Sequence, residues 1–255
     1  MPDQFINLDG RQAFVTGGSR GLGRAIAARL AEAGAAIAIT DHPDALAGAD
    51  LPDGWTAHPV DLLSGGAEVD LATAIGTLPR LDILIANAGL VPPWRGAADL
   101  DIAEWERVFR VNVTGIAMTL KAAAGPLAAS GRGAAVLMAS INAYKAHPSQ
   151  ILYTATKHAV LGIMRAAALD LGRSGVRVNA LAPGPIATDA LRSRVEVRHK
   201  AGGPAAADAL AMLADETALG RIATERDVAD AALYLASDLS GAVTGTLLPV
   251  ECGLG

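Results

Sequence analysis

The stretch QAFVTGGSRGLGRAIAARLAEAG, Gln12–Gly34, decides the fold of this chain. It opens with an apolar run, Gln12–Thr16, that is typical of a buried strand. The glycine-rich segment Thr16–Gly23 follows, and it leads directly into an alanine- and leucine-rich helix expected at Leu22–Ala33. A strand, a glycine loop and a helix in this order place backbone N–H groups and the positive end of a helix where a pyrophosphate can bind.

The glycines of this loop have separate expected roles. Gly17 and Gly21 permit a tight turn, and Gly23 lets the helix pack closely on the strand. Their spacing is G-x3-G-x-G, which differs from the common G-x-G-x-x-G fingerprint, and an ordinary turn is the alternative. Because of the context, we expect the loop to bind a dinucleotide through Gly17, Ser19, Arg20, Gly21, Leu22 and Gly23.

Outward from this stretch, short apolar runs alternate with helical segments along the whole chain. The further strands are expected at Ala35–Thr40, Trp55–Val60, Asp82–Ala86, Ala134–Ala139, Val176–Leu181 and Thr246–Val250. The further helices are expected at Ala67–Thr77, Ile102–Ala129, Ile151–Arg173 and Val228–Ser237. Strands without in–out alternation are buried on both faces. The pattern therefore predicts an α/β fold, a doubly wound parallel sheet with helices on both faces.

The long interruption of this rhythm is the stretch from about residue 189 to 219. An insertion after the carboxyl end of a strand is a typical substrate lid. No linker rich in Ser, Gly or Pro divides the sequence. We therefore expect one domain, residues 1–255, with a flap at about 189–219.

Composition excludes several classes of protein. The 255 residues are 51% hydrophobic and 18% charged, with a net charge of −5 and no basic block, which argues against nucleic-acid binding and disorder. No apolar run approaches the ~18–20 residues of a membrane span. The chain starts without a secretory signal, its one cysteine is Cys252, and its five histidines lack metal-ligand spacing. We expect a cytoplasmic protein without a metal.

Polar residues follow the second, third and fourth expected strands. Asp41 can accept hydrogen bonds from a ribose, although with Pro43 it could also simply start a turn. Asp61, beside Leu62, can reach an adenine, and the small-residue turn Asn87-Ala88-Gly89 leaves room for a cofactor. All lie at the carboxyl ends of strands, where open α/β sheets bind ligands. Their joint placement predicts a dinucleotide site.

The helix expected at Ile151–Arg173 carries Tyr153 and Lys157 one turn apart on an otherwise apolar face. A lysine there is costly unless it is paired or functional. Its ammonium group would lower the pKa of Tyr153, which could then exchange a proton with an alcohol oxygen. The alternative is a lysine that reaches solvent beside a half-buried tyrosine.

Further candidates surround this pair. Ser140 follows the fifth strand and could donate a hydrogen bond to a substrate oxygen, and Asn142 and Gln150 are further polar candidates for substrate contact. Asn112 lies mid-helix, where asparagine is a poor helix former, so we expect a kink or a bound water there. Trp94 could form a wall of the pocket, with ordinary packing as the equal alternative. Among the histidines, only His147 is a candidate for a position near substrate.

These residues, in this order and spacing, resemble the short-chain dehydrogenase/reductase family along essentially the whole chain. The matching positions are Thr16-Gly17-x3-Gly21-x-Gly23, Asn87-Ala88-Gly89, Asn112, Ser140, Tyr153-x3-Lys157 and Pro183-Gly184-x3-Thr188. The resemblance implies a seven-stranded sheet, a nicotinamide cofactor and a homotetramer. It implies that Tyr153 is the acid/base, that Ser140 positions the substrate oxygen and that Lys157 binds the nicotinamide ribose. Asn112 would hold a water, Thr188 the carboxamide, and Pro183, Gly184 and Ile186 would line the cofactor.

Two departures from the family pattern matter. Val250-Glu251-Cys252-Gly253 stands where relatives usually have Asp-Gly-Gly, which affects packing near the carboxyl terminus. Arg20 lies in the glycine loop although Asp41 ends the second strand. An arginine there favours NADP(H), but the acid sits against the ribose itself, so we expect NAD(H) to be preferred.

The favoured hypothesis is hydride transfer between NAD(H) and a secondary alcohol or ketone, with a polyol or sugar as a weak indication. The alternatives are an NADPH-dependent 3-oxoacyl reductase and a catalytically silent dinucleotide-binding protein. A silent protein would be free to lose Tyr153, Lys157 or Ser140, and all three are present. A homo-oligomer is expected because the helices at 102–129 and 151–173 carry apolar residues on more than one face, Ile163 and Leu169 among them.

Overall fold

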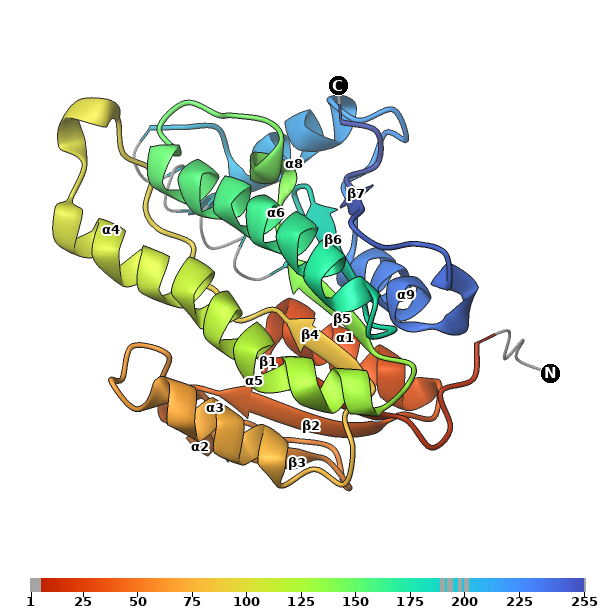
Figure 1. The fold of residues 1–255 in the computed structure, drawn as a ribbon. Helices are drawn as coiled ribbons and strands as arrows, with labels where there is room; N and C mark the ends of the chain where they lie inside the picture. The colour runs from red at the N-terminus through yellow and green to blue at the C-terminus, as the bar shows by residue number, and fades with distance from the viewer. Residues whose placement is uncertain (1–5, 189–190, 192–194, 197–198, 200–201, 255) are drawn as a thin grey trace.

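The computed structural model describes residues 6–188, 191, 195–196, 199 and 202–254. Its centre is a seven-stranded parallel sheet with the strand order β3-β2-β1-β4-β5-β6-β7 (Figure 1). The strands are β1 (Gln12–Thr16), β2 (Ala36–Asp41), β3 (Thr56–Pro59), β4 (Ile83–Ala86), β5 (Ala134–Met138), β6 (Arg177–Pro183) and β7 (Leu247–Val250). The predicted fold class is confirmed, with strand ends shifted by one or two residues.

Helices cover both faces of the sheet (Figure 1). On one face, α1 (Gly21–Glu32) packs against α9 (Glu225–Ala236). The other face is covered by α3 (Ala67–Gly76), α5 (Gly115–Ala129) and α6 (Ile151–Gly172). Two separate apolar clusters result, one on each face, because β1, β4 and β5 are buried along their full length. The strand order reverses between β1 and β4, and open α/β sheets bind ligands at such a point.

The helix predicted at Ile102–Ala129 is not continuous. It consists of α4 (Ile102–Phe109), one π-helical turn (Arg110–Thr114) and α5. The π turn contains Asn112, so the irregularity expected at this residue is confirmed, while the prediction of one unbroken helix was wrong. A π turn is found most often at functional sites, because the extra residue redirects side chains.

Helix starts follow their sequence signals. The carboxylate of Asp101 accepts hydrogen bonds from the backbone N–H groups of Ala103 and Glu104. Thr224 and Asp227 form a complete capping box, so α9 begins at Glu225, three residues before the predicted start. The sequence reading missed α2 (Pro43–Ala47), where Pro43 begins a short helix, and α8 (Ala206–Asp215) within the predicted flap.

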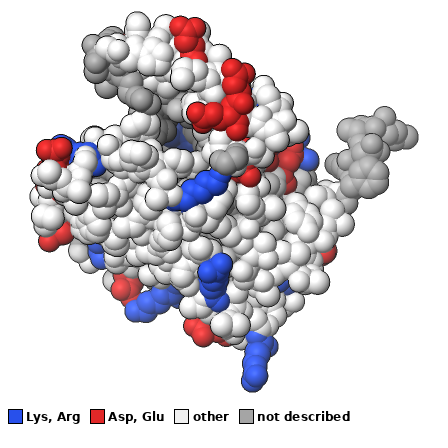
Figure 2. Space-filling model, turned by 90° about the horizontal axis from the view of Figure 1, so that it is seen from above, with Lys and Arg blue, Asp and Glu red and all other residues white. Residues whose placement is uncertain are grey.

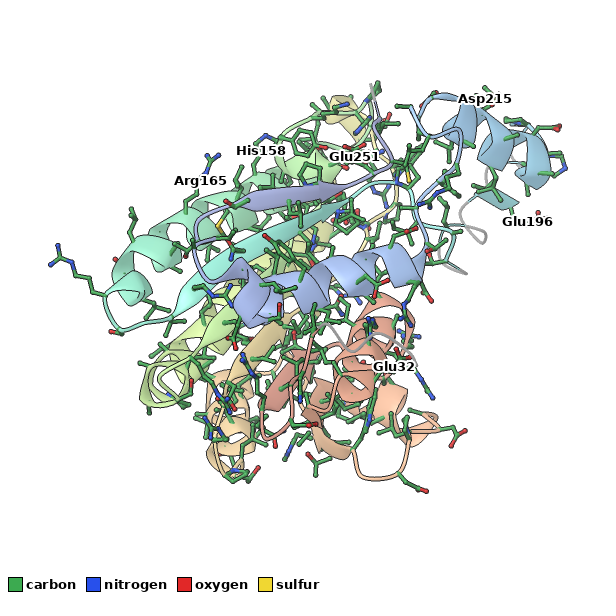
Figure 3. All side chains as sticks on the ribbon, turned by 90° about the vertical axis from the view of Figure 1, so that its right-hand side faces the viewer. Glu32, His158, Arg165, Glu196, Asp215 and Glu251 are labelled. Carbon is green, nitrogen blue, oxygen red and sulfur yellow. The ribbon has the colours of Figure 1, made fainter. Side chains whose placement is uncertain are left out.

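Several segments of the flap lie outside the described residues. The part that follows α8 is anchored to the end of the chain, because Ala218 N–H donates to Gly253 O and Leu219 N–H donates to Cys252 O. Lys145 Nζ donates to Leu254 O at 2.7 Å. Figure 3 shows Asp215 in α8 and Glu251 beyond β7, at the same end of the molecule. Cys252, at the departure from the family pattern, has a φ of +61°, a conformation that glycine adopts more easily.

Charges of both signs are scattered over the face seen in Figure 2, and no continuous basic patch is visible there. None of the described helices is long and apolar enough to cross a membrane. Among the described residues, no cluster of His, Cys, Asp and Glu side chains could hold a metal ion.

Candidate active site

The start of α6 places Tyr153 and Lys157 together. Lys157 Nζ lies 5.5 Å from the centroid of the Tyr153 ring and donates a hydrogen bond of 2.8 Å to the carbonyl oxygen of Met138, the last residue of β5. Lys157 is only 5% exposed. Its burial lowers the pKa of the ammonium group to about 8. The side chain is therefore still mostly cationic at neutral pH, inside the protein, against the tyrosine ring.

A buried cation beside a phenol favours the ionised phenol. This is the arrangement that the sequence predicted from the spacing of Tyr153 and Lys157, and the two side chains do share one face of the helix. The alternative, a lysine that extends to solvent, is wrong because Lys157 is buried and bonded to the sheet.

Ser140 lies just beyond β5, at the carboxyl rim of the sheet, and is 7% exposed. Its hydroxyl oxygen accepts a hydrogen bond from the backbone N–H of Asn142 at 3.3 Å. The Asn142 amide nitrogen then donates to Gln150 Oε1 at 3.1 Å and to Thr154 Oγ1 at 2.9 Å. This network ties the Ser140 turn to the first turn of α6 and so fixes Ser140 relative to Tyr153.

Asn142 and Gln150 were predicted to contact substrate. In the structure they bond to one another, and Asn142 is 4% exposed, so the network gives Asn142 a positioning role. Substrate contact through Gln150, which lines the cleft described below, stays a prediction. Thr154 was missed, because a threonine in the first turn of a helix has no distinctive sequence signal.

Asn112 connects three parts of the site from within the π turn. Its Oδ1 accepts from Leu90 N–H at 2.7 Å, and its Nδ2 donates to Leu90 O at 2.8 Å and to Thr156 Oγ1 at 3.4 Å. These bonds hold the segment after β4 against α6, and the residue is 1% exposed. The proposed water at Asn112 stays a prediction.

The glycine loop has the predicted tight turn. Gly17 and Gly21 have φ values of +65° and +54°. A Cβ atom at Gly23 would lie 2.0 Å from the carbonyl oxygen of Gly17 and 2.5 Å from Asn87 Nδ2. Gly23 is therefore required by the loop that folds over it, and the predicted contact with the strand itself was not the decisive one.

The turn Asn87-Ala88-Gly89 is locked to this loop. The Thr16 hydroxyl oxygen accepts from the N–H groups of Asn87 and Ala88, both at 3.0 Å. Asn87 Nδ2 donates to Thr16 O at 3.1 Å and to Gly17 O at 3.0 Å. The bonds join the carboxyl ends of β1 and β4, the two strands that flank the reversal in strand order.

A dinucleotide fits this cradle. Within the described residues, no side chain caps α1, whose first turn holds no acidic residue, so its first N–H groups are available to phosphate oxygens. At Gly21 an added Cβ would meet nothing within 4 Å, so the loop is open on that side. Ser19, Arg20 and Leu22 belong to the same loop and first turn, as predicted.

Asp41 ends β2, as predicted, and its carboxylate is fixed. Oδ2 accepts from Ser19 N–H at 3.1 Å and from Ser19 Oγ at 2.6 Å, while Oδ1 accepts from His42 N–H at 2.8 Å. The carboxylate thus stands against the glycine loop. Pro43 indeed starts a local structure, α2, so both readings of this segment describe part of it.

The remaining predicted cofactor residues lie on the same rim. β3 ends at Pro59, not at Asp61, whose Oδ1 accepts from Leu63 N–H in a local turn. Leu62 packs against the core beside Gly115. Pro183 ends β6, Gly184 lies against Glu251, and Ile186 pairs with Ala223. The Thr188 hydroxyl oxygen accepts from Leu191 N–H. Direct cofactor contacts of these residues stay predictions.

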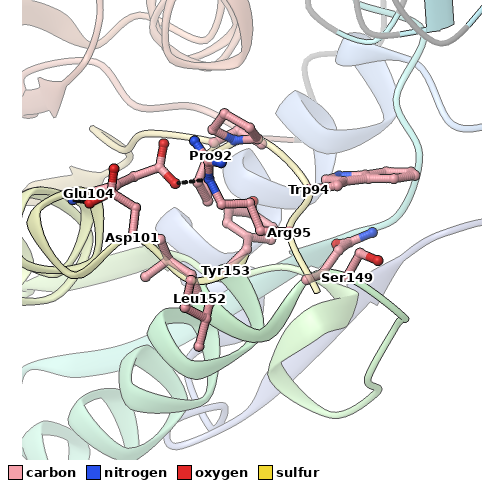
Figure 4. A pocket seen from close by; sticks show the side chains of 12 residues that line it. Pro92, Trp94, Arg95, Asp101, Glu104, Ser149, Leu152 and Tyr153 are labelled. Atoms are coloured by element: carbon pink, nitrogen blue, oxygen red, sulfur yellow. Dashed lines mark hydrogen bonds and ion pairs between the residues drawn. The ribbon is translucent and has the colours of Figure 1, made fainter. Parts of the chain in front are cut away.

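A cleft opens beside Tyr153 (Figure 4). Its lining is Val91, Pro92, Pro93, Trp94, Arg95, Leu100, Asp101, Glu104, Ser149, Gln150, Leu152 and Tyr153. Trp94, 46% exposed, lies along this cleft, as predicted. His147 does not appear among the described residues of the lining, and its buried Nε2 has no hydrogen-bond partner there.

The family is decided by comparison with known proteins. The family model described as enoyl-(acyl carrier protein) reductase matches residues 17–255. The chain is also 34% identical to short-chain dehydrogenase reductase 5 of Arabidopsis thaliana over 96% of this chain and 95% of that protein. The chain belongs to the short-chain dehydrogenase/reductase family. It is therefore a nicotinamide-dependent oxidoreductase that acts on CH–OH groups.

Individual members of the family are similar over their full length. Cis-4-hydroxycyclohexanecarboxylate dehydrogenase of Sinomonas cyclohexanicum is 37% identical over 95% of this chain and 96% of its own. Carveol dehydrogenase of Mycobacterium avium in complex with NAD superposes with a TM-score of 0.88 at 32% identity, covering 97% of this chain and 98% of that one. NAD⁺-bound xylitol dehydrogenase gives a TM-score of 0.86 at 27% identity, covering 96% and 99%.

Proposed function

We propose that this short-chain dehydrogenase/reductase transfers hydride between NAD(H) and a secondary alcohol or its ketone. The observation that carries the proposal is the buried Lys157 ammonium 5.5 Å from the Tyr153 ring, with Ser140 tied to the same helix through Asn142. A catalytically silent protein would have no use for a desolvated cation beside a tyrosine. The arrangement instead supplies a phenol beside a cation, which can act as acid/base, and a hydroxyl for orienting an oxygen.

In alcohol oxidation, the Ser140 hydroxyl orients the substrate oxygen and the Tyr153 oxygen takes its proton. Lys157 stabilises the negative charge of the tyrosine before the transfer. The glycine loop would hold the pyrophosphate of the dinucleotide, and the cofactor, when bound, would supply the acceptor for the hydride of the carbinol carbon. In ketone reduction the Tyr153 hydroxyl returns the proton to the developing alkoxide. The hydrogen bonds of Asn142 and Asn112 keep Ser140, Tyr153 and the loop after β4 in register during both directions.

NAD(H) is proposed as the preferred cofactor. Three donors hold the Asp41 carboxylate against the glycine loop, and a 2′-phosphate placed there would carry about −1.5 to −2 charges. Each unit pair at ~5 Å would repel by roughly 3 kcal/mol at an effective dielectric near 20. Exposed Arg20 opposes this repulsion, so we expect a net preference for NAD(H) of about 30- to 150-fold in kcat/KM. Steady-state rates with both cofactors test it, and equal or better rates with NADP(H) would contradict it.

The substrate is proposed to be a secondary alcohol on a small ring or a polyol chain. Relatives are named for cis-4-hydroxycyclohexanecarboxylate and L-rhamnose. A panel of cis-4-hydroxycyclohexanecarboxylate, L-rhamnose, xylitol, carveol and a 3-oxoacyl thioester, read by nicotinamide absorbance, decides the class. We expect oxidation of at least one alcohol by the wild type and none by Tyr153→Phe. Turnover confined to the thioester with NADPH would establish the alternative, a 3-oxoacyl reductase.

A homotetramer in the cytoplasm is also proposed. The outer face of α6 is open, since Leu169 is 81% exposed and His158 and Arg165 point away from the core (Figure 3). Ile163, predicted to lie on that outer face, instead packs against the core, so the open face is less apolar than the sequence suggested. Light scattering tests the assembly, and a monomer of 25.8 kDa at micromolar concentration would contradict it.

A further inference from the structure

The segment after β4 brings one cation into the cleft beside Tyr153. Arg95 lines the cleft together with Tyr153, and its backbone is fixed to the segment that precedes α6. Arg95 N–H donates to Ser149 O at 2.8 Å, and Arg95 pairs with Gln150 in a parallel bridge. Ser149 has a φ of +62°, a conformation that costs a non-glycine residue energy and tends to persist at functional sites. The position of Arg95 is thereby coupled to the helix that carries the acid/base.

The Arg95 guanidinium is held in one orientation and still has N–H donors for a ligand. Its Nε donates to Glu104 Oε2 at 3.0 Å (Figure 4). The arginine side chain remains 39% exposed, whereas that of Glu104 is 18% exposed. A guanidinium has four further N–H donors on its two terminal nitrogens, in the planar fork that matches a carboxylate. A partly exposed ion pair is worth little, about 0–1 kcal/mol, so sharing the arginine with a second carboxylate costs little.

The acidic residues near Arg95, Glu104 and Asp101, are compatible with a bound anion. Arg95 offsets the charge of Glu104, and the Asp101 carboxylate accepts from the N–H groups of Ala103 and Glu104 at the positive end of α4. Much of the remaining wall is apolar, with Val91 and Trp94 each 46% exposed and Pro92, Pro93 and Leu152 beside them. Ser149, Gln150 and Tyr153 add polar groups to the lining. A ligand suited to this cleft has a compact apolar body and an anionic end.

We propose that Arg95 binds a carboxylate of the substrate, so that this enzyme favours secondary alcohols that carry an acid group. The inference rests on the proposed alcohol oxidation and names its substrate class. The carbinol lies at Tyr153 and Ser140, the body of the molecule lies along the Trp94 wall, and the carboxylate pairs with the terminal nitrogens of Arg95. Glu104 then orients the guanidinium and, in the absence of substrate, competes for it.

The test compares an acid with its neutral ester. Hydroxycyclohexanecarboxylate and its methyl ester are oxidised by the wild type, Arg95→Gln, Arg95→Lys and Glu104→Gln at saturating cofactor. Charge-assisted hydrogen bonds are worth about 1.5–3 kcal/mol, so Arg95→Gln should lower the acid-to-ester ratio of kcat/KM about 10- to 100-fold, mainly through KM. Arg95→Lys should lose less, and Glu104→Gln should raise the ratio. Arg107→Gln, an exposed arginine of α4 outside the described lining of the cleft, is the matched control and should leave the ratio unchanged.

Binding is measured separately, so that failure of the inference and failure of the proposed function are distinguishable. Cyclohexanecarboxylate, which has no carbinol, is titrated calorimetrically into the enzyme loaded with NAD⁺. We expect a Kd at least tenfold weaker for Arg95→Gln than for the wild type. If neither alcohol is oxidised but this difference is found, the proposed reaction fails and the carboxylate site stands. The inference would be overturned if Arg95→Gln lowered kcat/KM equally for the acid and the ester, or if it bound cyclohexanecarboxylate like the wild type. Arg95 would then only support the loop.

Discussion

All strands of the central sheet begin on one side, here called the amino edge, and end on the other, here called the carboxyl edge. The polar groups at these two sides are arranged in opposite ways. At the amino edge, the fully buried Asp82 carboxylate accepts from Gln12 N–H, Arg80 and Arg132, at 2.9, 2.7 and 3.1 Å. The guanidinium of Arg177, at the start of β6, donates to Leu235 O, Ser237 O and Ser240 Oγ. These donors and acceptors are satisfied within the chain, so this edge is built for stability.

At the carboxyl edge, some donors are not matched by acidic or capping side chains within the described part of the chain. The first turn of α1 has no side-chain cap among the described residues, and the desolvated Lys157 ammonium donates to a backbone carbonyl oxygen, that of Met138. This difference between the two edges indicates that stability is sacrificed for catalysis at the carboxyl edge. Substitutions at the carboxyl edge should remove activity while the fold survives, and substitutions at the amino edge should do the reverse.

The largest expected effect is on the rate of Tyr153→Phe. The ring and its packing remain, but the proton acceptor is lost, and general acid–base catalysis contributes about 10²–10⁴ in rate. Turnover and cofactor affinity, measured on the same preparation, should show loss of kcat with nearly unchanged cofactor binding. More than a tenth of wild-type turnover would remove Tyr153 from the chemistry.

Asp82→Ala should have the largest effect on stability. It removes the acceptor of the buried Gln12 N–H and the partner of Arg80 and Arg132, which are 42% and 38% exposed. Leaving a buried donor unsatisfied costs about 1–3 kcal/mol. Its hydrogen bonds with the arginines and Gln12 N–H outweigh desolvation and hold the pKa of Asp82 below its usual value, so the wild-type stability from this group is present at neutral pH and lost as pH falls through that lowered pKa. Urea unfolding of both proteins at neutral pH measures the difference. Comparable stability would show that the amino edge is not the structural one.

Gly23→Ala should weaken cofactor binding more than it weakens the fold. The new methyl group would lie 2.0 Å from Gly17 O, which belongs to the backbone, so the loop must open. Overpacking of this kind costs about 1–3 kcal/mol, and we expect a loss of cofactor affinity of about 10- to 100-fold. Fluorescence titration with NADH measures it. Gly76→Ala, at the end of α3 where a Cβ meets nothing within 4 Å, is the matched control and should bind normally.

Lys157→Met, at the carboxyl edge, should increase the stability of the fold while it removes activity. The lowered pKa of about 8, against an ordinary value of 10.5, means that burial of the charged lysine destabilises the fold at neutral pH. That penalty is fully present below pH 8 and disappears as pH rises toward 10.5, where the unfolded chain also loses the proton. We expect Lys157→Met to be about 1–3 kcal/mol more stable at pH 7, less so at pH 10, and inactive. Lower stability of the variant at pH 7 would contradict a destabilising role for the charge.

The hydrophobic pattern of the sequence was sufficient to predict the strands of the sheet. Continuous apolar runs identify strands buried on both faces, and the glycine spacing identifies the loop, because these features depend on near neighbours in the chain. The caps at Asp101 and Thr224 likewise rest on a local pattern, a capping residue with an acid three positions later. The pairing of Tyr153 with Lys157 was predictable for the same reason, since residues four apart share a helix face.

Only the tertiary structure decided which residues of the site bond to one another. The π turn at Asn112, the bracing of Ser140 by Asn142 and Thr154, and the joining of Asn87 to Gly17 all depend on contacts between segments far apart or on alternatives of similar local energy. Arg95 is an unremarkable loop residue in the sequence, and it gains its place beside Tyr153 from the bonds that join its loop to Ser149. The sequence by itself determined the fold and the reacting pair, because both follow from short-range pattern. The shape and charge of the substrate cleft depend on loops, whose conformation is set by the long-range contacts that close them.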